Sequence, residues 1–334
     1  MRFYEINIFE ENKVIKNYSS HKNGVYNHGA LMVEFDIQQV CLSTPAGESR
    51  LTIWGISPAD MQQARLNYNN KKIQIFAGMA AGFPLAGKHG KGLVIEGVVN
   101  QVFGNWQGTE LRLDFVIFAG PAKTDKDGAV SSEKITFPWS VGQKLSVALT
   151  QCIMRMGGYR PNINISDLLV LNYERPMFCD SITLLARDLK NFSRSVIRDP
   201  GYSGVEMAIV NQNEIRVWDN DYKNHPSGVN ERKNNPLQIE FTDLIGQPTW
   251  ISYGVVSILC VMRADIHTGD HILMPKNSRP LIQAASFSQY RDDSAFQGQF
   301  EVQSVRFLGN SRQPTADSWI TIIEAHPAGE LKAK

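Results

Sequence analysis

At 334 residues the chain is longer than one hydrophobic core usually supports, so two or three domains are expected. Hydrophobic residues make up 43% and charged residues 20%, a balance that excludes an intrinsically disordered chain. The formal net charge of +1, from 34 basic and 33 acidic residues, argues against a dedicated nucleic-acid-binding protein, because such proteins normally carry a basic excess.

The sequence carries no targeting or membrane signal that we recognise. Residues Met1–Glu5 lack the apolar core of a secretory signal peptide. No run approaches the roughly 20 apolar residues that a membrane-spanning helix needs. We therefore expect a protein that is made in the cytoplasm and has no membrane span.

The first region, residues 1–120, is predicted to be an antiparallel barrel or sandwich. Its apolar and alternating runs predict strands over residues 3–9, 30–42, 51–54, 72–76, 93–103 and 110–118. Ser57 as N-cap, Pro58 at the first helical position and Asp60 in the first turn predict a helix of one or two turns. Polar residues 17–29 predict a loop, and Gly104–Asn105 a turn.

The middle region, residues 121–236, is predicted to be an α+β domain. Residues 123–134 are charged or small, which indicates a linker or a loop that orders only against a neighbour, if at all. The remaining expected elements are helices over 141–156 and 180–192, a hairpin of 205–209 with 214–218, and a polar loop over 219–236. Gly157–Gly158 would end the first helix, and Asp180 would be the N-cap of the second.

The last region, residues 237–334, returns to strands. They are expected over 252–262, 269–274, 298–308 and 318–325, with a turn at Gly309–Asn310. Gly92–Phe118 and Gly298–Ala325 share one order, a strand with an early Glu, a Gly–Asn pair and a second strand. Strand–turn–strand units are common enough for chance to produce this match. A true repeat would mean two related β domains flanking an insert.

The four cysteines are far apart and never form a CxxC pair. Cys41 and Cys260 lie in apolar strand-like runs, and Cys152 and Cys179 lie on or beside helix-like ones. Free cysteine packs as a small hydrophobic residue, so we expect four buried free thiols.

Two motifs resemble binding sites but lack what the chemistry requires. Residues Gly82–His89 fit GxxxxGK, yet His follows the Lys instead of Ser or Thr, and a strand follows instead of a helix. His267 and His271 are four residues apart, but Thr268–Asp270 between them form a turn, and no third ligand is within reach in sequence. We therefore predict no cofactor and no metal.

Catalytic patterns are equally weak. Glu96, Asp114 and Glu301 alternate with apolar residues on strands, where a glycosidase pair is conceivable but lone strand carboxylates are commoner. No GxSxG elbow or papain-like cysteine context is present, although a triad assembled only in space stays open. The tryptophans expected in a core or an interface, rather than in a sugar platform, are Trp54, Trp139, Trp218 and Trp250. We assign no catalytic residue.

The order of the predicted strands and helices resembles that of a known protein family. The run Leu51–Ser57, a short helix and then Lys72–Gly78 resembles the first domain of baseplate hub proteins in contractile-tailed bacteriophages. In that family an apolar strand ending near Ser leads into a helix, a strand ending in Gly, and a strand with a bulky residue near Gly. Val94–Val99 matches the last piece.

The C-terminal part is similar to the closing domain of the same family. That domain tends to have Gly-Asp before a strand, then Gly-x-aromatic-x-Val, a turn, and a Trp-Thr-like strand. Gly269–Asp270, Gly298–Val302 and Trp319–Thr321 fit those positions, and Pro138–Gly142 before a helix resembles an insert of some phage hubs. Each motif is short, but together they cover most of the chain in order.

The resemblance implies two tube-like antiparallel β-barrel domains per chain, flanking the α+β region, and a homotrimer. Three chains with two barrels each would form a pseudo-sixfold ring between the hexameric tail tube protein and the trimeric central spike protein. Tape measure and baseplate wedge proteins would be further partners, with DNA only in transit through the lumen. The protein would lie in the virion tail baseplate and would be assembled in the host cytoplasm. Hub proteins of tailocins and of type VI secretion systems are related to this family, and the resemblance extends to them.

Two other function classes remain as alternatives. A receptor- or glycan-binding tail module would use exposed aromatic residues, with Trp106, Tyr222 and Tyr290 as candidates. A tail-associated cell-wall hydrolase would need Glu96 or Glu301 as a catalytic carboxylate.

Overall fold

The computed structural model describes residues 1–44, 48–80, 91–120, 122–124, 130–210, 213–226, 231–275 and 298–328. The chain forms two compact units. Unit 1 takes Met1–Gln38, Gly47–Ala119 and Leu237–Lys334, and unit 2 takes Gln39–Ala46 and Gly120–Pro236. The predicted fold class, mainly β with a smaller α+β region, is confirmed.

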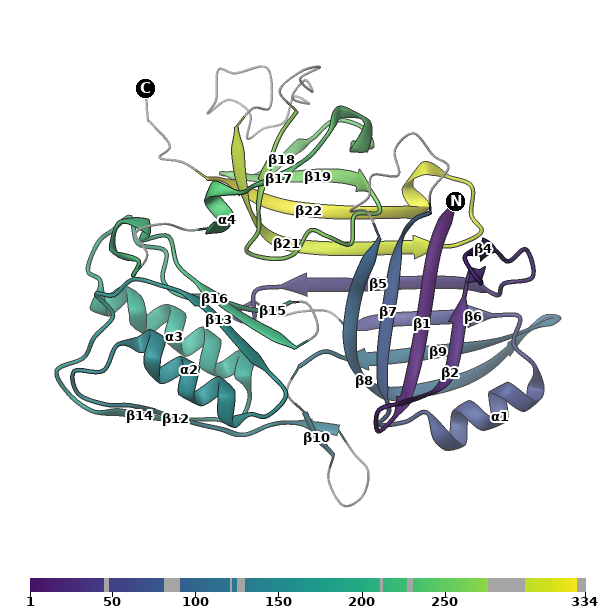
Figure 1. Cartoon of the computed structure of the whole chain (residues 1–334), viewed down its shortest axis with the longest axis horizontal. Helices are drawn as coiled ribbons and strands as arrows, with labels where there is room; N and C mark the ends of the chain where they lie inside the picture. The colour runs from purple at the N-terminus through teal and green to yellow at the C-terminus, as the bar shows by residue number, and fades with distance from the viewer. Residues whose placement is uncertain are drawn as a thin grey trace. The chain divides into compact units, whose positions relative to one another are not determined.

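Unit 1 is built on one 13-stranded sheet within the described residues, shown in Figure 1. Its order is β18 (Thr249–Ser252), β19 (Val255–Val261), β22 (Trp319–Pro327), β21 (Gln299–Asn310), β5 (Met32–Val40), β6 (Ser49–Trp54), β9 (Glu110–Phe118), β8 (Gly92–Gln107), β7 (Lys72–Met79), β1 (Arg2–Glu10) and β2 (Lys13–Ser19). Short β20 (His271–Leu273) pairs with β21 and with β17 (Leu237–Gln238). Strands from both predicted β regions therefore share a single sheet, joined where β21 meets β5.

One face of this sheet carries a continuous hydrophobic core. Buried side chains alternate along the strands, and the cluster runs from the first β region to the last one. Its members include Ile6, Val33, Ile53, Ile75, Leu113, Ile258, Val305 and Ile323. The intervening side chains point to the opposite side and are mostly half-buried.

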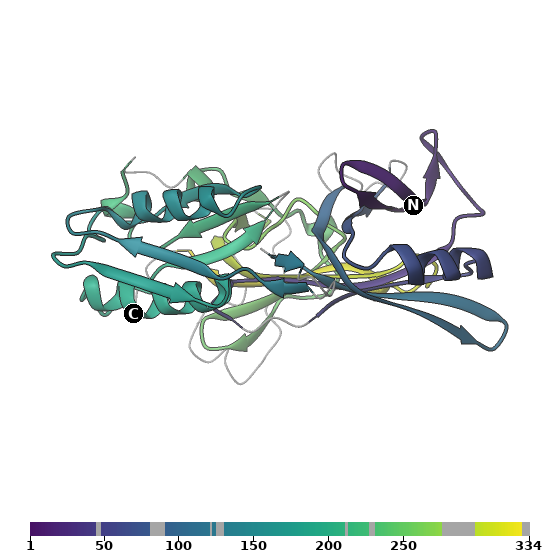
Figure 2. The ribbon, with the colours of Figure 1, turned by 90° about the horizontal axis from the view of Figure 1, so that it is seen from below.

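Helix α1 (Pro58–Asn67) begins as predicted, but it is ten residues long instead of one or two turns. The Asp60 backbone N–H donates to the hydroxyl of Ser57 at 3.1 Å, which confirms the N-cap. Only Ala64 of this helix is fully buried. Figure 2 shows the β8–β9 hairpin running alongside α1 and past its end.

The two predicted Gly–Asn turns are wrong, for a shared physical reason. Gly104 lies inside β8 and Gly309 inside β21, and the β8–β9 turn falls instead at Gly108, which has φ +61°. A Cβ on Gly104 would lie 2.5 Å from Met61 Cγ, and one on Gly309 would lie 2.3 Å from Phe35 Cζ. Both glycines therefore make room for a bulky side chain lying against the strand.

The loop predicted over residues 17–29 is partly strand. Its first residues complete β2, and β3 (His21–Lys22) pairs with β4 (Val25–Tyr26). The amide of Asn17 donates to Asn7 Oδ1 across the strand pair at 2.7 Å, which suits a polar residue on an outermost strand. Of the expected linker, the two ends form β10 (Ala122–Thr124) and β11 (Val130–Ser132), and residues 125–129 lie outside the described ranges.

Within the described residues, unit 2 combines two long helices with a two-stranded ribbon and a three-stranded sheet, in addition to the β10–β11 pair. The ribbon pairs β12 (Ile135–Trp139) with β14 (Arg175–Cys179), and the second sheet has the order β13 (Arg160–Asn164), β16 (Glu214–Trp218) and β15 (Glu206–Val210). Helix α2 (Leu145–Arg155) contacts β12 and β13, and α3 (Ile182–Val196) contacts β14 and β15. Each helix therefore links the ribbon to the sheet.

The predicted helices of unit 2 exist with shifted starts. Gly142 has φ +70°, a left-handed conformation, so α2 begins only at Leu145. The N-cap of α3 is Ser181, whose hydroxyl accepts from the Leu184 N–H, and not Asp180. The loop after β16 holds two short helices, η1 (Tyr222–Asn224) and α4 (Glu231–Asn234). Within the described ranges, no helix combines the length and apolar composition that crossing a membrane requires.

Candidate functional site

The sheet of unit 1 presents a second face, opposite the core, that we call the outer face. It is formed by the alternate side chains of the central strands. Its cations are Arg50, Lys72, Arg112 and Arg306, and its carboxylates are Glu5, Glu34, Asp36, Glu96, Asp114, Glu301 and Glu324. Acidic groups therefore outnumber basic ones on this face.

Each cation of the outer face is paired with a carboxylate. Arg306 donates from Nε and Nη2 to Asp36 at 2.8 and 2.6 Å, and Lys72 Nζ lies 2.9 Å from Glu96. The remaining pairs are Arg112 with Asp114 at 3.1 Å and Arg50 with Glu48 at 3.0 Å. Among the described residues, the outer face thus has no lysine or arginine without a carboxylate partner, and its carboxylates outnumber its cations.

The junction of β5 and β21, which we call the seam, joins the two β regions. The Val33 N–H donates to Ser311 Oγ at 2.9 Å, and the Ser311 N–H returns a bond to Val33 O at 2.8 Å. Trp319 packs edge-on against Phe35, with ring centroids 5.2 Å apart. Its indole N–H also donates to Gly78 O at 2.9 Å, so hydrogen bonds and core packing both hold the seam.

The structure does not bring together the carboxylates that the sequence offered as a catalytic pair. Asp114 lies opposite Phe103, seven positions along β8 from Glu96, which is about 23 Å at roughly 3.3 Å per residue. Two strands, β5 and β6, separate Glu301 on β21 from β9, or about 14 Å at roughly 4.8 Å per spacing. Glycosidase pairs need separations of at most about 9.5 Å.

The two histidines of the HxxxH spacing bind different carboxylates. His267 Nδ1 lies 3.6 Å from Asp270, and His271 Nε2 lies 3.8 Å from Glu301 across the β20–β21 pair. No group of three metal-ligating side chains occurs within the described ranges. The GxxxxGK-like residues Gly82–His89 lie outside them.

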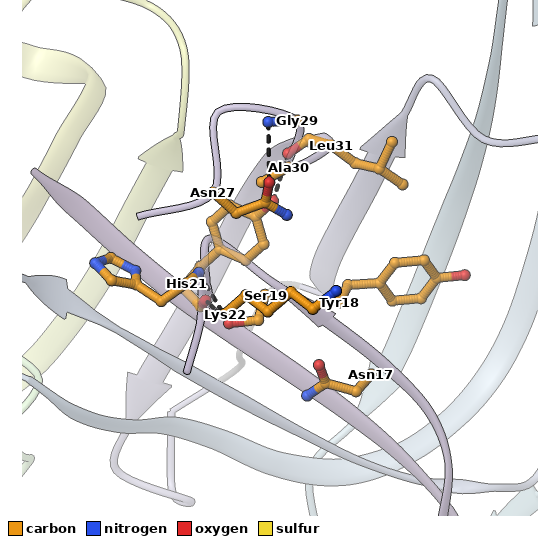
Figure 3. A pocket seen from close by; sticks show the side chains of 10 residues that line it. Asn17, Tyr18, Ser19, His21, Lys22, Asn27, Gly29, Ala30 and Leu31 are labelled. Carbon is orange, nitrogen blue, oxygen red and sulfur yellow. Dashed lines mark hydrogen bonds between the residues drawn. The ribbon is translucent and has the colours of Figure 1, made fainter. Parts of the chain in front are cut away.

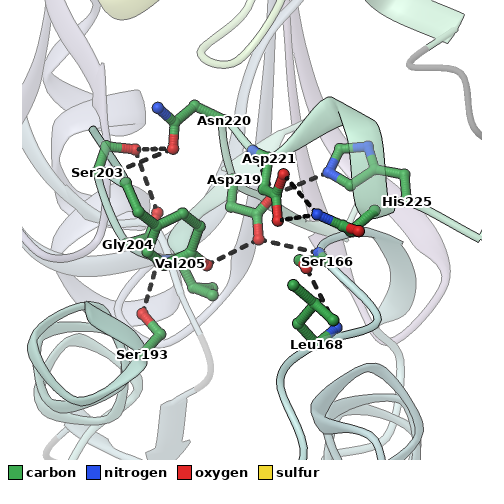
Figure 4. A network of polar contacts seen from close by, with 12 residues as sticks. Ser166, Leu168, Ser193, Ser203, Gly204, Val205, Asp219, Asn220, Asp221 and His225 are labelled. Atoms are coloured by element: carbon green, nitrogen blue, oxygen red, sulfur yellow. Dashed lines mark hydrogen bonds and ion pairs between the residues drawn. The ribbon is translucent and has the colours of Figure 1, made fainter. Parts of the chain in front are cut away.

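Sequence reasoning missed a buried polar cluster in unit 2, which we call the Asp219 node (Figure 4). Asp219 follows β16, and its side chain and that of His225 are both fully buried. Asp219 Oδ1 lies 2.7 Å from His225 Nε2, while Oδ2 accepts from the Tyr202 hydroxyl at 2.7 Å and the Ser166 N–H at 2.9 Å. One carboxylate thereby ties together three segments distant in sequence.

The node has two members of a catalytic triad but not the chemistry of one. His225 Nδ1, where a nucleophile would stand, is buried and has no hydrogen-bond partner among the described residues. Burial, and then the charge of Asp219, raise the pKa of the Tyr202 hydroxyl, so that group remains a donor. The arrangement orders loops; its only sequence signal is an Asp placed directly after a strand.

The aromatic residues singled out in the sequence include both buried and exposed side chains. Trp139, Trp218 and Trp250 are buried, which confirms their place in a core. The ring of Trp54 lies under the Arg112 guanidinium at 4.9 Å. Among the glycan-binding candidates, Trp106 near the β8–β9 tip is 78% exposed, Tyr222 is half-buried, and Tyr290 lies outside the described residues.

The cysteines are four buried free thiols, as predicted. Burial raises the pKa of the Cys152 thiol to about 11 and that of Cys260 to about 12, and it also raises the pKa of Cys179. Thiols held neutral in this way are poor nucleophiles.

No protein-family model and no curated protein matches the sequence. Among solved structures, the chain is similar to the 43 kDa tail protein of prophage MuSo2 from Shewanella oneidensis, with a TM-score of 0.51 and 7% identity, over 98% of this chain and 97% of that one. A type VI secretion component of E. coli, described as structurally similar to the T4 tail proteins gp27 and gp5, gives 0.49 and 12%, over 91% and 76%. The likeness to the MuSo2 protein shows a common fold.

Proposed function

We propose that the chain is a structural protein of a phage-type tail, and within the tail a baseplate hub. In this role a homotrimer forms a pseudo-sixfold ring that joins the hexameric tail tube to the trimeric central spike in the virion. The observation that carries the proposal is the seam, where β5 and β21 join two β regions of one chain into a single sheet. Three chains would then supply six β regions to a ring. The fold shared with the MuSo2 tail protein supports the same role.

The charge of the outer face supports a place along the channel for tape measure protein and DNA. DNA binding is driven by cations that neutralise phosphates, and every cation of this face already has a carboxylate partner. A wall of this kind lets a polyanion pass without holding it. Retention of duplex DNA by the purified protein, falling steeply with salt, would count against this assignment.

The hub assignment is tested by mass in solution. Light scattering over a wide concentration range should give three times the chain mass of 37.5 kDa, alone or with the neighbouring tube and spike proteins added. A ring that closes only on a spike predicts a monomer alone and a trimer in the mixture. A chain that stays monomeric with both partners present would contradict the hub assignment.

A second candidate function, glycan or receptor binding, is favoured by one observation, the 78% exposed ring of Trp106. Aromatic faces near a hairpin tip can stack on sugar rings. Trp106→Ala would then abolish binding on a glycan array, whereas Leu66→Ala, which removes a side chain 74% exposed on α1, would not. An array without signal for the unaltered protein would remove this candidate.

A further inference from the structure

A pocket in unit 1 lies between strands β1 and β2, at one edge of the sheet, and the segment that includes the β3–β4 hairpin (Figure 3). It has a volume of about 310 Å³, at the small end for a ligand site. Tyr4, Asn17, Tyr18, Ser19, His21, Lys22, Asn27, Gly29, Ala30 and Leu31 line it. These residues include two groups that can carry positive charge and no carboxylate.

The walls of the pocket are fixed by hydrogen bonds and ring packing. The Tyr4 hydroxyl donates to Leu31 O, and Asn27 Oδ1 accepts from the Gly29 N–H at 3.0 Å. The His21 ring packs between two aromatic rings, with centroids 5.5 Å from Phe3 and 5.7 Å from Tyr26. The site therefore needs little ordering to receive a ligand.

Cations surround the pocket without neutralising partners. Arg312 Nη2 donates to Ala30 O, a carbonyl of the pocket wall, at 2.7 Å. Lys91 Nζ stands 3.6 Å above the ring of Phe3, which itself packs on His21. Among the described residues, neither these two cations nor Lys22 forms an ion pair with a carboxylate.

Lys91 and Arg312 also influence the pKa values of two side chains in the pocket wall, His21 and Tyr4. Burial, and then the charge of Lys91, lower the pKa of His21, and Arg312 counteracts the increase in the pKa of Tyr4 that burial causes. This end of the unit thus gathers three cations, Lys22, Lys91 and Arg312, that form no ion pair with a carboxylate among the described residues, which favours a positive potential there. It differs from the outer face, where every cation is paired.

We propose that this pocket binds a small anionic group, a carboxylate or a phosphate. Lys22 supplies a mobile ammonium, Arg312 a guanidinium at the rim, and the amide N–H₂ of Asn27 and the ring of His21 supply neutral donors. Charge-assisted hydrogen bonds from such groups are stronger than neutral ones. The inference is independent of the hub assignment, because it concerns one pocket and not the assembly of chains.

The test is an NMR titration of the His21 imidazole in phosphate, in succinate and in chloride at equal ionic strength. A bound anion favours the imidazolium, so phosphate or succinate should raise the His21 pKa relative to chloride. Lys22→Gln and Arg312→Gln should each weaken the anion affinity by at least about tenfold, as expected for one charge-assisted bond. Lys13→Gln, at the far end of β2, should leave it unchanged.

The same titration separates the sources of the anion. A hexaglutamate peptide that binds more tightly than succinate would assign the pocket to an acidic segment of a partner protein. Equal affinities for peptide and succinate, or a preference for phosphate, would assign it to a free small anion. Superimposable His21 titration curves in all solutions would overturn the proposal. All three altered side chains are exposed, so the variants should fold.

Discussion

The Asp219 node of unit 2 and the Asp36–Arg306 pair at the seam of unit 1 both place a carboxylate where separate segments meet. Asp219 and His225 have fully buried side chains, whereas Asp36 and Arg306 are 39% and 43% exposed. Water can replace either partner at the seam, but nothing can replace the carboxylate in the node. The comparison teaches that burial, more than the number of bonds, decides what a polar contact contributes.

The largest effect is expected when the node is opened. Asp219→Ala leaves the Tyr202 hydroxyl, the Ser166 N–H and His225 buried without their acceptor, so unit 2 should lose about 3–5 kcal/mol of stability. Urea unfolding and hydrogen exchange at the Ser166 amide measure this loss. Asp188→Asn, on an exposed position of α3, is the control and should be neutral. A loss below about 1 kcal/mol would refute the role of the node.

Changes in side-chain packing at the seam should lower the stability of the protein more than removal of its ion pair. Gly309→Ala places a Cβ 2.3 Å from Phe35 Cζ, so the ring or the strand must move, at a cost of about 1–3 kcal/mol. Gly29→Ala, whose Cβ meets only Asn27 Oδ1 at 3.4 Å, should cost far less. A double-mutant cycle with Phe35→Leu tests the contact itself, because Phe35→Leu should cost less in a chain that already carries Gly309→Ala. Simple additivity would contradict the clash.

Local signals in the sequence were sufficient for several elements. Strict alternation over residues 110–118 predicted β9 with its observed bounds, and Ser57 with Pro58 fixed the start of α1. The hairpin of β15 and β16 also follows from two β-rich runs with a polar turn between them. Each of these elements depends on residues adjacent in the chain, where propensity and periodicity decide.

What the sequence could not provide depends on contacts between distant segments. Arg306 and Asp36 are 270 positions apart, and nothing in either strand indicates that β21 would pair with β5. The turns predicted at Gly104 and Gly309 were wrong because a glycine that makes room for a side chain, here Met61 or Phe35, cannot be told in the sequence from a glycine that forms a turn. The Asp219 node was missed likewise, since it gathers polar residues from several loops. The pocket of Figure 3 was missed because residues 17–31 close around Tyr4 of β1, a contact that the polar composition of this segment does not indicate.

The ion pair of the seam should contribute less than its packing. Arg306→Ala or Asp36→Ala should cost about 0.2–1 kcal/mol, because both side chains are well exposed to solvent. Urea midpoints at low and high salt provide the measurement, and the cost should shrink in high salt as the charges are screened. Arg50→Ala, which removes the partner of Glu48 in a pair exposed by more than half, is the control with almost no effect. A loss comparable to that of Asp219→Ala would overturn the contrast between the two sites.

The smallest effect is expected from the pH dependence of Asp60, at the start of α1. Its hydrogen bond from Lys16 Nζ, at 2.6 Å, is the main cause that lowers the pKa of Asp60 below the ordinary value of 3.8, assisted by Ser57 and opposed by burial. A carboxyl whose pKa is lowered by folding stabilises the protein above its unfolded pKa and loses that stabilisation as the pH falls through its folded pKa. With both partners partly exposed, the contribution should be about 0.5 kcal/mol.

The urea midpoint of the unaltered protein should differ between a pH above the unfolded pKa of Asp60 and a pH below its folded pKa. The part of this difference that is due to Asp60 should vanish in Asp60→Asn. Loss of the same pH-dependent difference in Lys16→Gln would show that the ion pair carries the effect, whereas a difference that persists in Lys16→Gln would assign it to the helix cap.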